Sequence, residues 1–308
     1  MDDWRRWPRE RLEREYSPSS VLDSIEPFVR AYAERSMEAL ARLPVRRDVR
    51  YGPGDDDRLD LAPAGTGAPL LVFFHGGYWQ ELGKADTLFP APGLVADGIA
   101  YAAVEYTLAP RASLDQIVDQ AMRSVAFLAR NAEALGIDGR RIHVAGHSAG
   151  AQLAAMTMLG DSRGVNGPGS VSIAGGVLVS GVYELEPLIG TSINDALGLD
   201  ADAARRNSPL RLCRGAAPQA VGQAAGHRAS PAPAIVCWGE NEPSEFGRQG
   251  RALASAWAAA GGPVQALEVA GRNHFDILFD LADAHSELGA AVRSQVLGDG
   301  GRADADPG

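Results

Sequence analysis

The sequence predicts a single α/β domain in which a mostly parallel central sheet is flanked by helices. Two observations support this prediction. Short apolar runs such as residues 70–74 and 99–105 lack alternating polar positions, which is the pattern of parallel strands buried on both faces. These runs alternate along the chain with segments of helical periodicity, as in βαβ units. A chain of 308 residues is long enough to bury one large core.

The predicted elements follow one another in a regular order. Residues 1–43 form a helical extension, in which an amphipathic helix over 26–40 ends before Pro44. A leading hairpin is expected around the turn at 52–54. Strands are predicted at 47–51, 58–62, 70–74, 99–105, 141–145, 176–180, 234–238 and 264–269. Helices are predicted at 113–134, 148–159, 245–260 and 277–292.

Three stretches fall outside this alternation. Residues 160–170 are rich in glycine and predict a surface loop. Residues 181–230 lack long strand patterns, and we expect short helices there that form a small cap-like insertion over the carboxyl edge of the sheet. Residues 298–308 are rich in Gly and Asp and predict a disordered tail. The predicted domain therefore spans residues 1–297.

Charge and hydropathy limit the classes of partner. The formal net charge is −10 and the sequence pI is about 5.1, which argues against nucleic acid as a partner. No apolar run approaches the roughly 18 residues that span a bilayer, and residues 1–6 are charged without an apolar segment behind them. We expect a cytoplasmic protein that acts on a small molecule. The sequence is compatible with a homodimer but does not determine the oligomeric state.

The cysteines and histidines indicate neither a disulfide framework nor a metal site. The chain has only two cysteines, Cys213 and Cys237, and the second lies within a predicted strand. The six histidines are scattered and show no spacing typical of metal ligands. We therefore expect no metal and no cofactor.

The segment Gly146-His147-Ser148-Ala149-Gly150 lies between a predicted strand and an apolar helix. That context is the one required of a G-x-S-x-G nucleophile elbow, the signature of the α/β-hydrolase fold. The flanking glycines permit a sharp turn that exposes the serine Oγ at a helix N-terminus. Ser148 is the predicted nucleophile. The alternative is a glycine-rich turn whose serine only caps a helix.

A serine nucleophile needs a base, which in this fold follows it in the chain. Three histidines follow Ser148. His274 is placed in the loop after the last predicted strand, whereas His227 lies in the irregular stretch and His285 within a helical pattern. His274 is therefore the predicted base, with a solvated loop histidine as the alternative reading.

The acid that orients the histidine should follow the strand 234–238. Three carboxylates compete there. Glu240 is still close to the strand end, and Glu245 is placed to open the next helix, where it would complement the helix dipole. Glu242 lies in the middle of the loop and is favoured as the acid, because a glutamate can hold the imidazole tautomer. Glu240 and Glu245 remain the alternatives.

The stretch His75-Gly76-Gly77-Tyr78-Trp79 ends a predicted strand with two adjacent glycines. Bare backbone at that point suits an oxyanion hole, which needs N–H donors close to a tetrahedral intermediate. Gly76 and Gly77 are the predicted donors of this loop, and the amide of Ala149 is the other. His75 is expected to brace the loop rather than contact substrate.

These residues together resemble the arylformamidase (kynurenine formamidase) family of α/β-hydrolases. The resemblance rests on the segments at 75–79, 146–151 and 273–275, and it extends through 106–110, 180–187, 192–197 and 206–209 to the segment 15–19 near the N-terminus. It implies hydrolysis of N-formyl-L-kynurenine to L-kynurenine and formate, in tryptophan degradation, with Ser148 as nucleophile and His274 as base. One departure is that members of the family usually carry aspartate where Glu242 stands.

An aromatic leaving group needs a flat apolar wall. The candidates for this wall are Tyr78, Trp79, Tyr183 and Phe275. Core packing is the competing reading for each, and it is favoured for Trp79 and Phe275. The sequence singles out no cation for the substrate carboxylate; Arg111 and Lys84 are considered for this role without a motif to support them.

Two rival functions remain open on the sequence. A carboxylesterase acting on small acyl esters would use the same three catalytic residues, and a related enzyme could cleave another aromatic formamide. A binding module without activity is the second rival, but such proteins typically lose the serine or the histidine, and both are present here.

Overall fold

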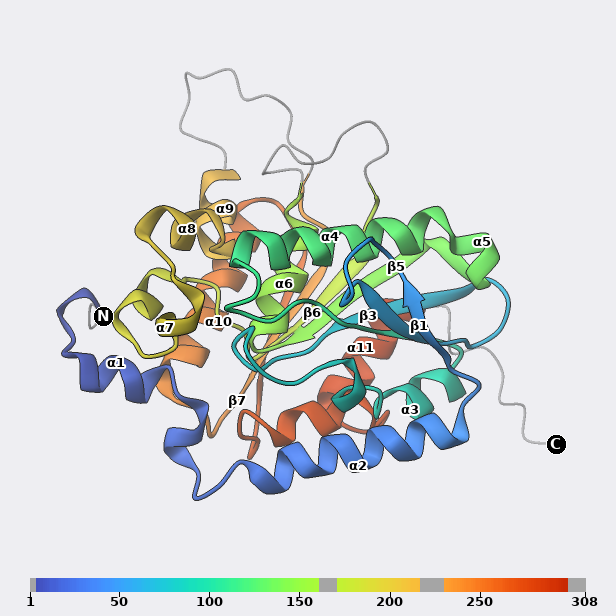
Figure 1. Ribbon diagram of the computed structural model, residues 1–308, viewed down its shortest axis with the longest axis horizontal. Helices are drawn as coiled ribbons and strands as arrows, with labels where there is room; N and C mark the ends of the chain where they lie inside the picture. The colour runs from blue at the N-terminus through green and yellow to red at the C-terminus, as the bar shows by residue number, and fades with distance from the viewer. Residues whose placement is uncertain (1–3, 161–170, 217–229, 299–308) are drawn as a thin grey trace, which may run out of the picture.

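The computed structural model describes residues 4–160, 171–216 and 230–298 (Figure 1). Within these residues, eight strands form one sheet in the order β1-β2-β4-β3-β5-β6-β7-β8. The strands are β1 (Arg46–Arg50), β2 (Arg58–Ala62), β3 (Ala68–Phe74), β4 (Ala100–Val104), β5 (Ile137–His147), β6 (Gly175–Val179), β7 (Ala234–Gly239) and β8 (Val264–Val269). The mostly parallel sheet and its flanking helices confirm the predicted α/β-hydrolase fold class.

The pairing of the strands explains which end of the sheet carries chemistry. β1 and β2 are antiparallel, as the predicted hairpin requires, and β2 also runs antiparallel to β4. Every pairing from β4 to β8 is parallel. The carboxyl ends of β3, β5, β6, β7 and β8 therefore meet at one edge, where ligands bind in open α/β sheets.

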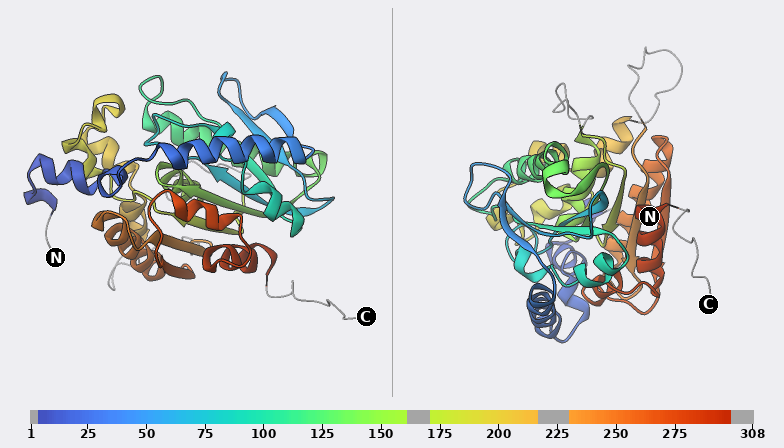
Figure 2. Two further views of the ribbon diagram at one scale, coloured as in Figure 1. Left: turned by 90° about the horizontal axis from the view of Figure 1, so that it is seen from below. Right: turned by 90° about the vertical axis from the view of Figure 1, so that its right-hand side faces the viewer.

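Helices cover both faces of the sheet, and α2, α3 and α11 lie on the face opposite α4 and α6 (Figures 1 and 2). The longer helices are α2 (Glu26–Arg42), α4 (Leu114–Arg130), α6 (Ala149–Met158), α10 (Ser244–Ala259) and α11 (Glu287–Leu297). The shorter ones are α1 (Arg9–Glu15), α3 (Ala91–Ala96), α5 (Ala132–Leu135), α7 (Asn194–Leu197), α8 (Ala201–Arg206) and α9 (Pro209–Ala216). Single 3₁₀ turns lie at Trp4–Arg6, Pro18–Val21, Lys84–Asp86, Glu186–Gly190 and Asp276–Leu281. Among the described helices, none is long and apolar enough to cross a membrane.

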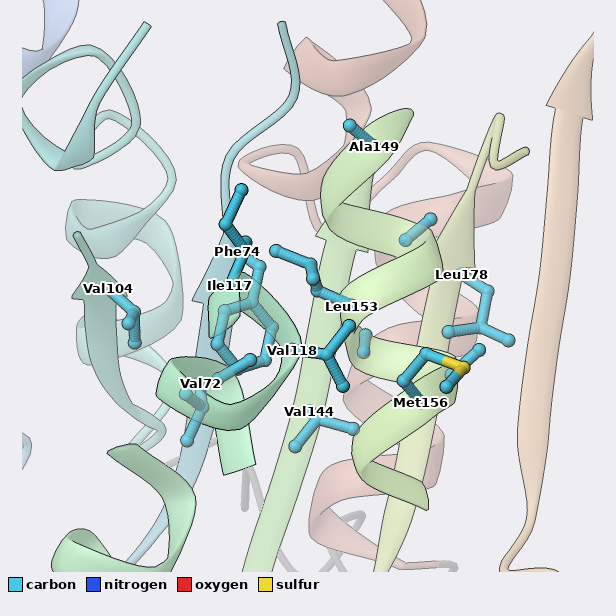
Figure 3. Packing of buried hydrophobic residues seen from close by; sticks show 14 of the residues in the cluster. Val72, Phe74, Val104, Ile117, Val118, Val144, Ala149, Leu153, Met156 and Leu178 are labelled. Carbon is cyan, nitrogen blue, oxygen red and sulfur yellow. The ribbon is translucent and has the colours of Figure 1, made fainter. Parts of the chain in front are cut away.

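The central strand β3 is apolar and buried at every position, so both faces of the sheet are covered by core side chains there. Successive residues of β3 point to opposite faces, so Val72 and Phe74 pack into one core cluster and Leu71 and Phe73 into the other. Figure 3 shows the first cluster, in which side chains of α6 and α4 cover the strands. It contains Ile117, Val118, Leu153 and Met156 beside Val72, Phe74 and Val144. This close packing of apolar side chains holds α6 on the sheet.

Two predicted helices are each divided in two. The segment 113–134 forms α4 and α5, which meet at Asn131. The prediction of one helix over 277–292 was wrong, because a 3₁₀ turn at Asp276–Leu281 is followed by a turn and then by α11. The new helix begins where the Ser286 hydroxyl accepts a hydrogen bond from the amide of Gly289 at 2.9 Å. A serine cap of this kind starts a helix regardless of the apolar periodicity around it.

The described part of the insertion, residues 181–216, consists of short helices, as predicted. These helices lie beside α1 at the left of Figure 1, and the Glu13 carboxylate of α1 accepts hydrogen bonds from the amide and hydroxyl of Ser192 at 2.7 and 2.9 Å. The N-terminal extension and the insertion are therefore in direct contact. Residues 161–170 of the predicted loop 160–170, residues 217–229 of the insertion with His227, and residues 299–308 of the predicted tail 298–308 lie outside the described residues.

Candidate active site

Ser148 is the single residue between the end of β5 and the start of α6. Its backbone adopts φ 56° and ψ −119°, a conformation that L-residues rarely occupy and that often marks a functional site. The two flanking glycines permit it. A Cβ on Gly146 would lie 2.0 Å from the carbonyl oxygen of Gly150, and a Cβ on Gly150 would lie 2.0 Å from that of Phe74. The turn can close only with glycine at both positions.

His274 and Glu242 are joined by a hydrogen bond at the carboxyl edge of the sheet. His274 Nδ1 lies 2.7 Å from Glu242 Oε2, and both side chains are almost fully buried. The other carboxylate oxygen, Oε1, accepts hydrogen bonds from Ser180 Oγ and from the amide of Gly239, each at 2.6 Å. These three contacts satisfy a buried charge that would otherwise be costly. The bond to Nδ1 leaves Nε2 of His274 available as a base.

Ser180 was not singled out by the sequence reasoning. It directly follows β6, the neighbour of β7 in the sheet, and its fully buried hydroxyl holds Glu242. The available signal was its position, since residues that end adjacent parallel strands lie close together in space.

The structure separates the three candidate acids. Glu240 accepts a hydrogen bond from the amide of Gly271 at 2.8 Å in an exposed loop. Glu245 opens α10, where it accepts the Tyr16 hydroxyl at 2.5 Å and pairs with Arg248. Neither of these carboxylates is hydrogen-bonded to His274. The alternative histidine, His285, is exposed in the turn before α11.

His147 supports the backbone of His274. Its Nε2–H donates to the carbonyl oxygen of His274 at 2.7 Å, and the two rings are 4.6 Å apart. Burial, together with the neighbouring His274, holds the pKa of His147 well below its usual range. His147 is therefore neutral in the folded protein, where its ring holds the backbone of His274.

The neutral state of His147 predicts a pH dependence of stability. The unfolded chain protonates this histidine as the pH falls below its ordinary pKa of about 6.5, whereas the folded protein does not. At low pH the unfolded state therefore binds up to one more proton at this histidine than the folded state does, and the free energy of unfolding falls as the pH falls. In urea unfolding, the stability gap between the wild type and His147→Gln should narrow from about pH 7.5 to about pH 5.5. A gap that stays constant would contradict a neutral His147.

Gly76 of the segment 75–79 lies against Ser148, and Gly77 follows it in a tight turn. A Cβ on Gly76 would lie 3.1 Å from His147 Nδ1 and 3.2 Å from Ser148 Cβ. Gly77 has φ 93°, and a Cβ there would lie 2.3 Å from the carbonyl oxygen of Glu81. Ala149 begins α6 directly after the nucleophile. The three predicted oxyanion donors thus belong to backbone segments that surround Ser148.

His75 is fully buried behind this loop. Its ring contacts Glu105 Oε1 at 3.2 Å and the carbonyl oxygen of Gly76 at 2.9 Å, and it stacks on Tyr106 with ring centroids 4.1 Å apart. These contacts hold the backbone of the loop at its first residues, which fits the bracing role expected from the sequence.

A cavity of about 370 Å³ opens onto Ser148 and His274. The neighbours of these two residues, His147 and Phe275, also line it. Three further segments complete the lining: the N-terminal segment 13–32, the loop 77–82 and the pair Ser192–Ile193 of the insertion. Tyr16 and Tyr32 of the N-terminal segment were not predicted as site residues. Only the family resemblance of residues 15–19 pointed to this region, because nothing local indicates that it folds back over the sheet.

The four predicted aromatic wall residues divide into two pairs. Tyr78 and Phe275 line the cavity. Trp79 and Tyr183 are fully buried and are not among the lining residues, so their predicted place in the wall is corrected. Trp79 Nε1 donates to Gln152 Oε1 of α6 at 3.2 Å. The ring of Tyr183 packs where Gly181 lacks a side chain.

The two cations considered for the substrate carboxylate lie elsewhere. Lys84 forms ion pairs with Asp60 at 2.8 Å and Asp48 at 3.2 Å, and Arg111 pairs with Asp56 at 3.0 Å. Among the described residues that line the cavity, none is Lys or Arg, whereas Glu13 and Glu81 are both present. The described part of the chain also holds no group of three or more His, Cys, Asp or Glu suited to a metal ion.

Comparisons with known proteins identify the fold and the family of this chain. Residues 71–277 match a family described as the alpha/beta hydrolase fold. Kynurenine formamidase of Danio rerio is 34% identical over 92% of this chain and 94% of its own length. Kynurenine formamidase of Salmo salar is 33% identical over 94% and 96% of the two chains.

Solved structures give the same fold. A protein of Silicibacter sp. TM1040, provisionally assigned as a thioesterase, has a TM-score of 0.75 and 30% identity over 91% of this chain and 97% of its own. The carboxylesterase EstE1 from a metagenomic library has a TM-score of 0.67 and 23% identity over 89% and 98% of the two chains, a likeness of fold alone. The extent and identity of the sequence matches place the chain in the kynurenine formamidase family of the α/β-hydrolase fold.

Proposed function

We propose that this protein hydrolyses N-formyl-L-kynurenine to L-kynurenine and formate. The observation that carries the proposal is the bond between His274 Nδ1 and Glu242 at 2.7 Å, with Ser148 and His274 lining one cavity. That arrangement is a base oriented by an acid beside a strained serine, the combination needed for acyl transfer. The two fish relatives named as kynurenine formamidases support the choice of substrate.

In the first half of the reaction, Ser148 Oγ attacks the formyl carbon while His274 Nε2 takes its proton. The carbonyl oxygen becomes an oxyanion, which the amides of Gly76, Gly77 and Ala149 would stabilise. Collapse of the tetrahedral intermediate breaks the C–N bond, and the proton held on His274 passes to the departing arylamine. Glu242 stabilises the imidazolium that exists between these two steps.

In the second half, water replaces the arylamine. His274 Nε2 takes a proton from water as its oxygen attacks the formyl-serine carbon, and a second tetrahedral intermediate forms. Its collapse returns the proton to Ser148 Oγ and releases formate. Because the acyl group carries only a hydrogen, no separate acyl pocket is required, and the cavity serves the leaving group.

The cavity wall suits an aryl leaving group. Tyr78 and Phe275 present aromatic surface to the same cavity as Ser148, and the ring of Phe275 stacks on that of Phe28 with centroids 5.8 Å apart. Planar aromatic groups pack well against such surfaces. The aryl ring of the substrate also withdraws the nitrogen lone pair, which makes its formamide easier to cleave than an alkyl amide.

The test is the ratio of kcat/KM for N-formyl-L-kynurenine to that for p-nitrophenyl acetate. We expect kcat/KM for the formamide to be no more than about a hundredfold below that for the ester, although the ester has the better leaving group. A preference for the ester by more than about a hundredfold, or about 2.7 kcal/mol in transition-state stabilisation, would favour the alternative of a carboxylesterase.

The charges of the residues that line the cavity predict how the carboxylate and the ammonium group of the substrate affect kcat/KM. With Glu13 and Glu81 among the described lining residues and no Lys or Arg, the substrate carboxylate gains no ion pair from these residues. Removing it, as in N-formylkynurenamine, should change kcat/KM by less than about tenfold, or about 1.4 kcal/mol. Removing the ammonium group while keeping the carboxylate should lower kcat/KM by a larger factor. Steady-state kinetics on the three compounds would contradict this if the kynurenamine were the poorest.

A further inference from the structure

The loop that follows the predicted oxyanion glycines has an unusual backbone. Gly77, Tyr78 and Trp79 have φ of 93°, 49° and 60°, so three consecutive residues occupy the left-handed region. This conformation is unfavourable for residues with large side chains. A strained segment persists only where its surroundings hold it in place. The contacts that hold this one are therefore part of what positions the oxyanion donors beside Ser148.

Three consecutive side chains tie this loop to three different parts of the protein. The Tyr78 hydroxyl donates to the carbonyl oxygen of Tyr16 in the N-terminal segment. Trp79 Nε1 donates to Gln152 of α6 at 3.2 Å, and Gln80 Nε2 donates to the carbonyl oxygen of Ile193 in the insertion at 3.0 Å. Only the bond to α6 reaches the element that begins at the nucleophile elbow.

Tyr16 is a rigid partner for Tyr78. Its side chain is 1% exposed, and its hydroxyl donates to Glu245 Oε2 at 2.5 Å and accepts from Gln249 Nε2 at 2.9 Å. Glu245 is itself held by Arg248 through two hydrogen bonds of 2.6 and 2.8 Å. A buried, fully paired network of this kind specifies one arrangement of the groups it contains. The carbonyl of Tyr16 is thereby anchored to the start of α10.

We propose that Tyr78 is a positioning residue for the oxyanion loop, and that the N-terminal segment takes part in catalysis through the bond between the Tyr78 hydroxyl and the Tyr16 carbonyl. The segment lies outside the residues 71–277 that match the hydrolase family, yet it supports the turn that carries Gly77. This inference rests on the proposed serine mechanism but not on the identity of the substrate.

The test is Tyr78→Phe, which removes the hydroxyl and keeps the ring at the cavity wall. Misplaced oxyanion donors weaken transition-state binding without weakening ground-state binding. We therefore expect kcat to fall by about 10- to 100-fold on both N-formyl-L-kynurenine and p-nitrophenyl acetate, with KM changed by less than about twofold. The small ester is included because it makes little use of the aromatic wall.

The matched control is Tyr101→Phe. Tyr101 is a fully buried residue of β4 whose hydroxyl also donates to a backbone carbonyl, that of Thr87 at 2.7 Å. The Tyr101→Phe variant should lose free energy of unfolding for the same reason as Tyr78→Phe, the loss of one hydroxyl hydrogen bond, while it retains the wild-type kcat. An unchanged kcat in Tyr78→Phe, an effect limited to KM, or a loss confined to the larger substrate would each overturn the positioning role.

Tyr16→Phe tests the anchor separately. It leaves the carbonyl of Tyr16 in the chain but removes its bond to Glu245, so we expect a smaller loss of kcat than in Tyr78→Phe. Because both substitutions act through the same contact, the kcat of the double variant Tyr16→Phe/Tyr78→Phe should be no lower than that of Tyr78→Phe alone. If the losses of kcat in the two single variants multiply in the double variant, the two residues do not act through one contact. If the wild type does not turn over N-formyl-L-kynurenine, the proposed function fails, and the ester measurements still decide the role of Tyr78.

Discussion

Ser148→Ala is expected to lower kcat for N-formyl-L-kynurenine by at least about 10⁴-fold. The variant removes the hydroxyl proposed to form the formyl-enzyme, so we expect the remaining hydrolysis to come from water that attacks the formyl carbon directly. Steady-state assays of the purified variant, with enough enzyme to detect a trace rate, measure this loss. Binding of L-kynurenine should be retained, because the cavity wall is unchanged.

The matched control for this variant is Ser124→Ala. Ser124 is fully buried in α4, where its hydroxyl donates to the carbonyl of Ala121 at 2.7 Å. It therefore loses a buried hydroxyl without touching the cavity, and its kcat should stay within about twofold of the wild type. Appreciable turnover by Ser148→Ala beside a normal control would remove Ser148 as the nucleophile and leave the elbow as a structural turn.

Glu242→Gln is expected to lower kcat by about 10³- to 10⁴-fold while the fold is kept. The side chain keeps its shape and can still accept from Ser180 or Gly239. Its amide, however, cannot hold the Nδ1–H tautomer of His274 or stabilise the imidazolium. The measurement is kcat together with the melting temperature, since a loss of activity without a matching loss of stability indicates an electrostatic role.

Glu240→Gln is the control for the acid. It lies two residues earlier in the same loop, and its carboxylate accepts the amide of Gly271 rather than a ring nitrogen of His274. We expect kcat near that of the wild type. A large loss in Glu240→Gln, with little in Glu242→Gln, would transfer the role of the acid to Glu240 and require a rearranged loop in the working enzyme.

The residues that the sequence located most directly are those whose roles depend on nearby backbone. Ser148 needs a strand, a tight turn and a helix, and all three lie within a few residues of it. Gly76 follows the same logic at the end of β3. His274 could be chosen because few histidines follow the serine and only one lies just after the last strand. The motif and the order of the chain were enough to propose these positions.

Other assignments depended on which segments meet in space. Tyr78 and Trp79 are adjacent and belong to one motif, yet one lines the cavity and the other is buried against α6. The left-handed turn of the backbone directs them to different surroundings, and no periodicity reveals such a turn. Lys84 was considered a ligand for substrate, but it is paired with Asp60 of β2, a contact between elements that are not adjacent in the sequence.

What the sequence by itself determined was the alternation of strands and helices, the turn at Ser148, the pair of glycines at the end of β3 and a short list for the proposed base and acid. The tertiary structure alone decided that Glu242 reaches His274, that Ser180 supports it, and that the N-terminal segment with Tyr16 covers the cavity. The physical reason is the range of the interactions. Turns and strands follow from neighbouring residues, whereas a hydrogen bond between Tyr78 and Tyr16 depends on how the whole chain packs.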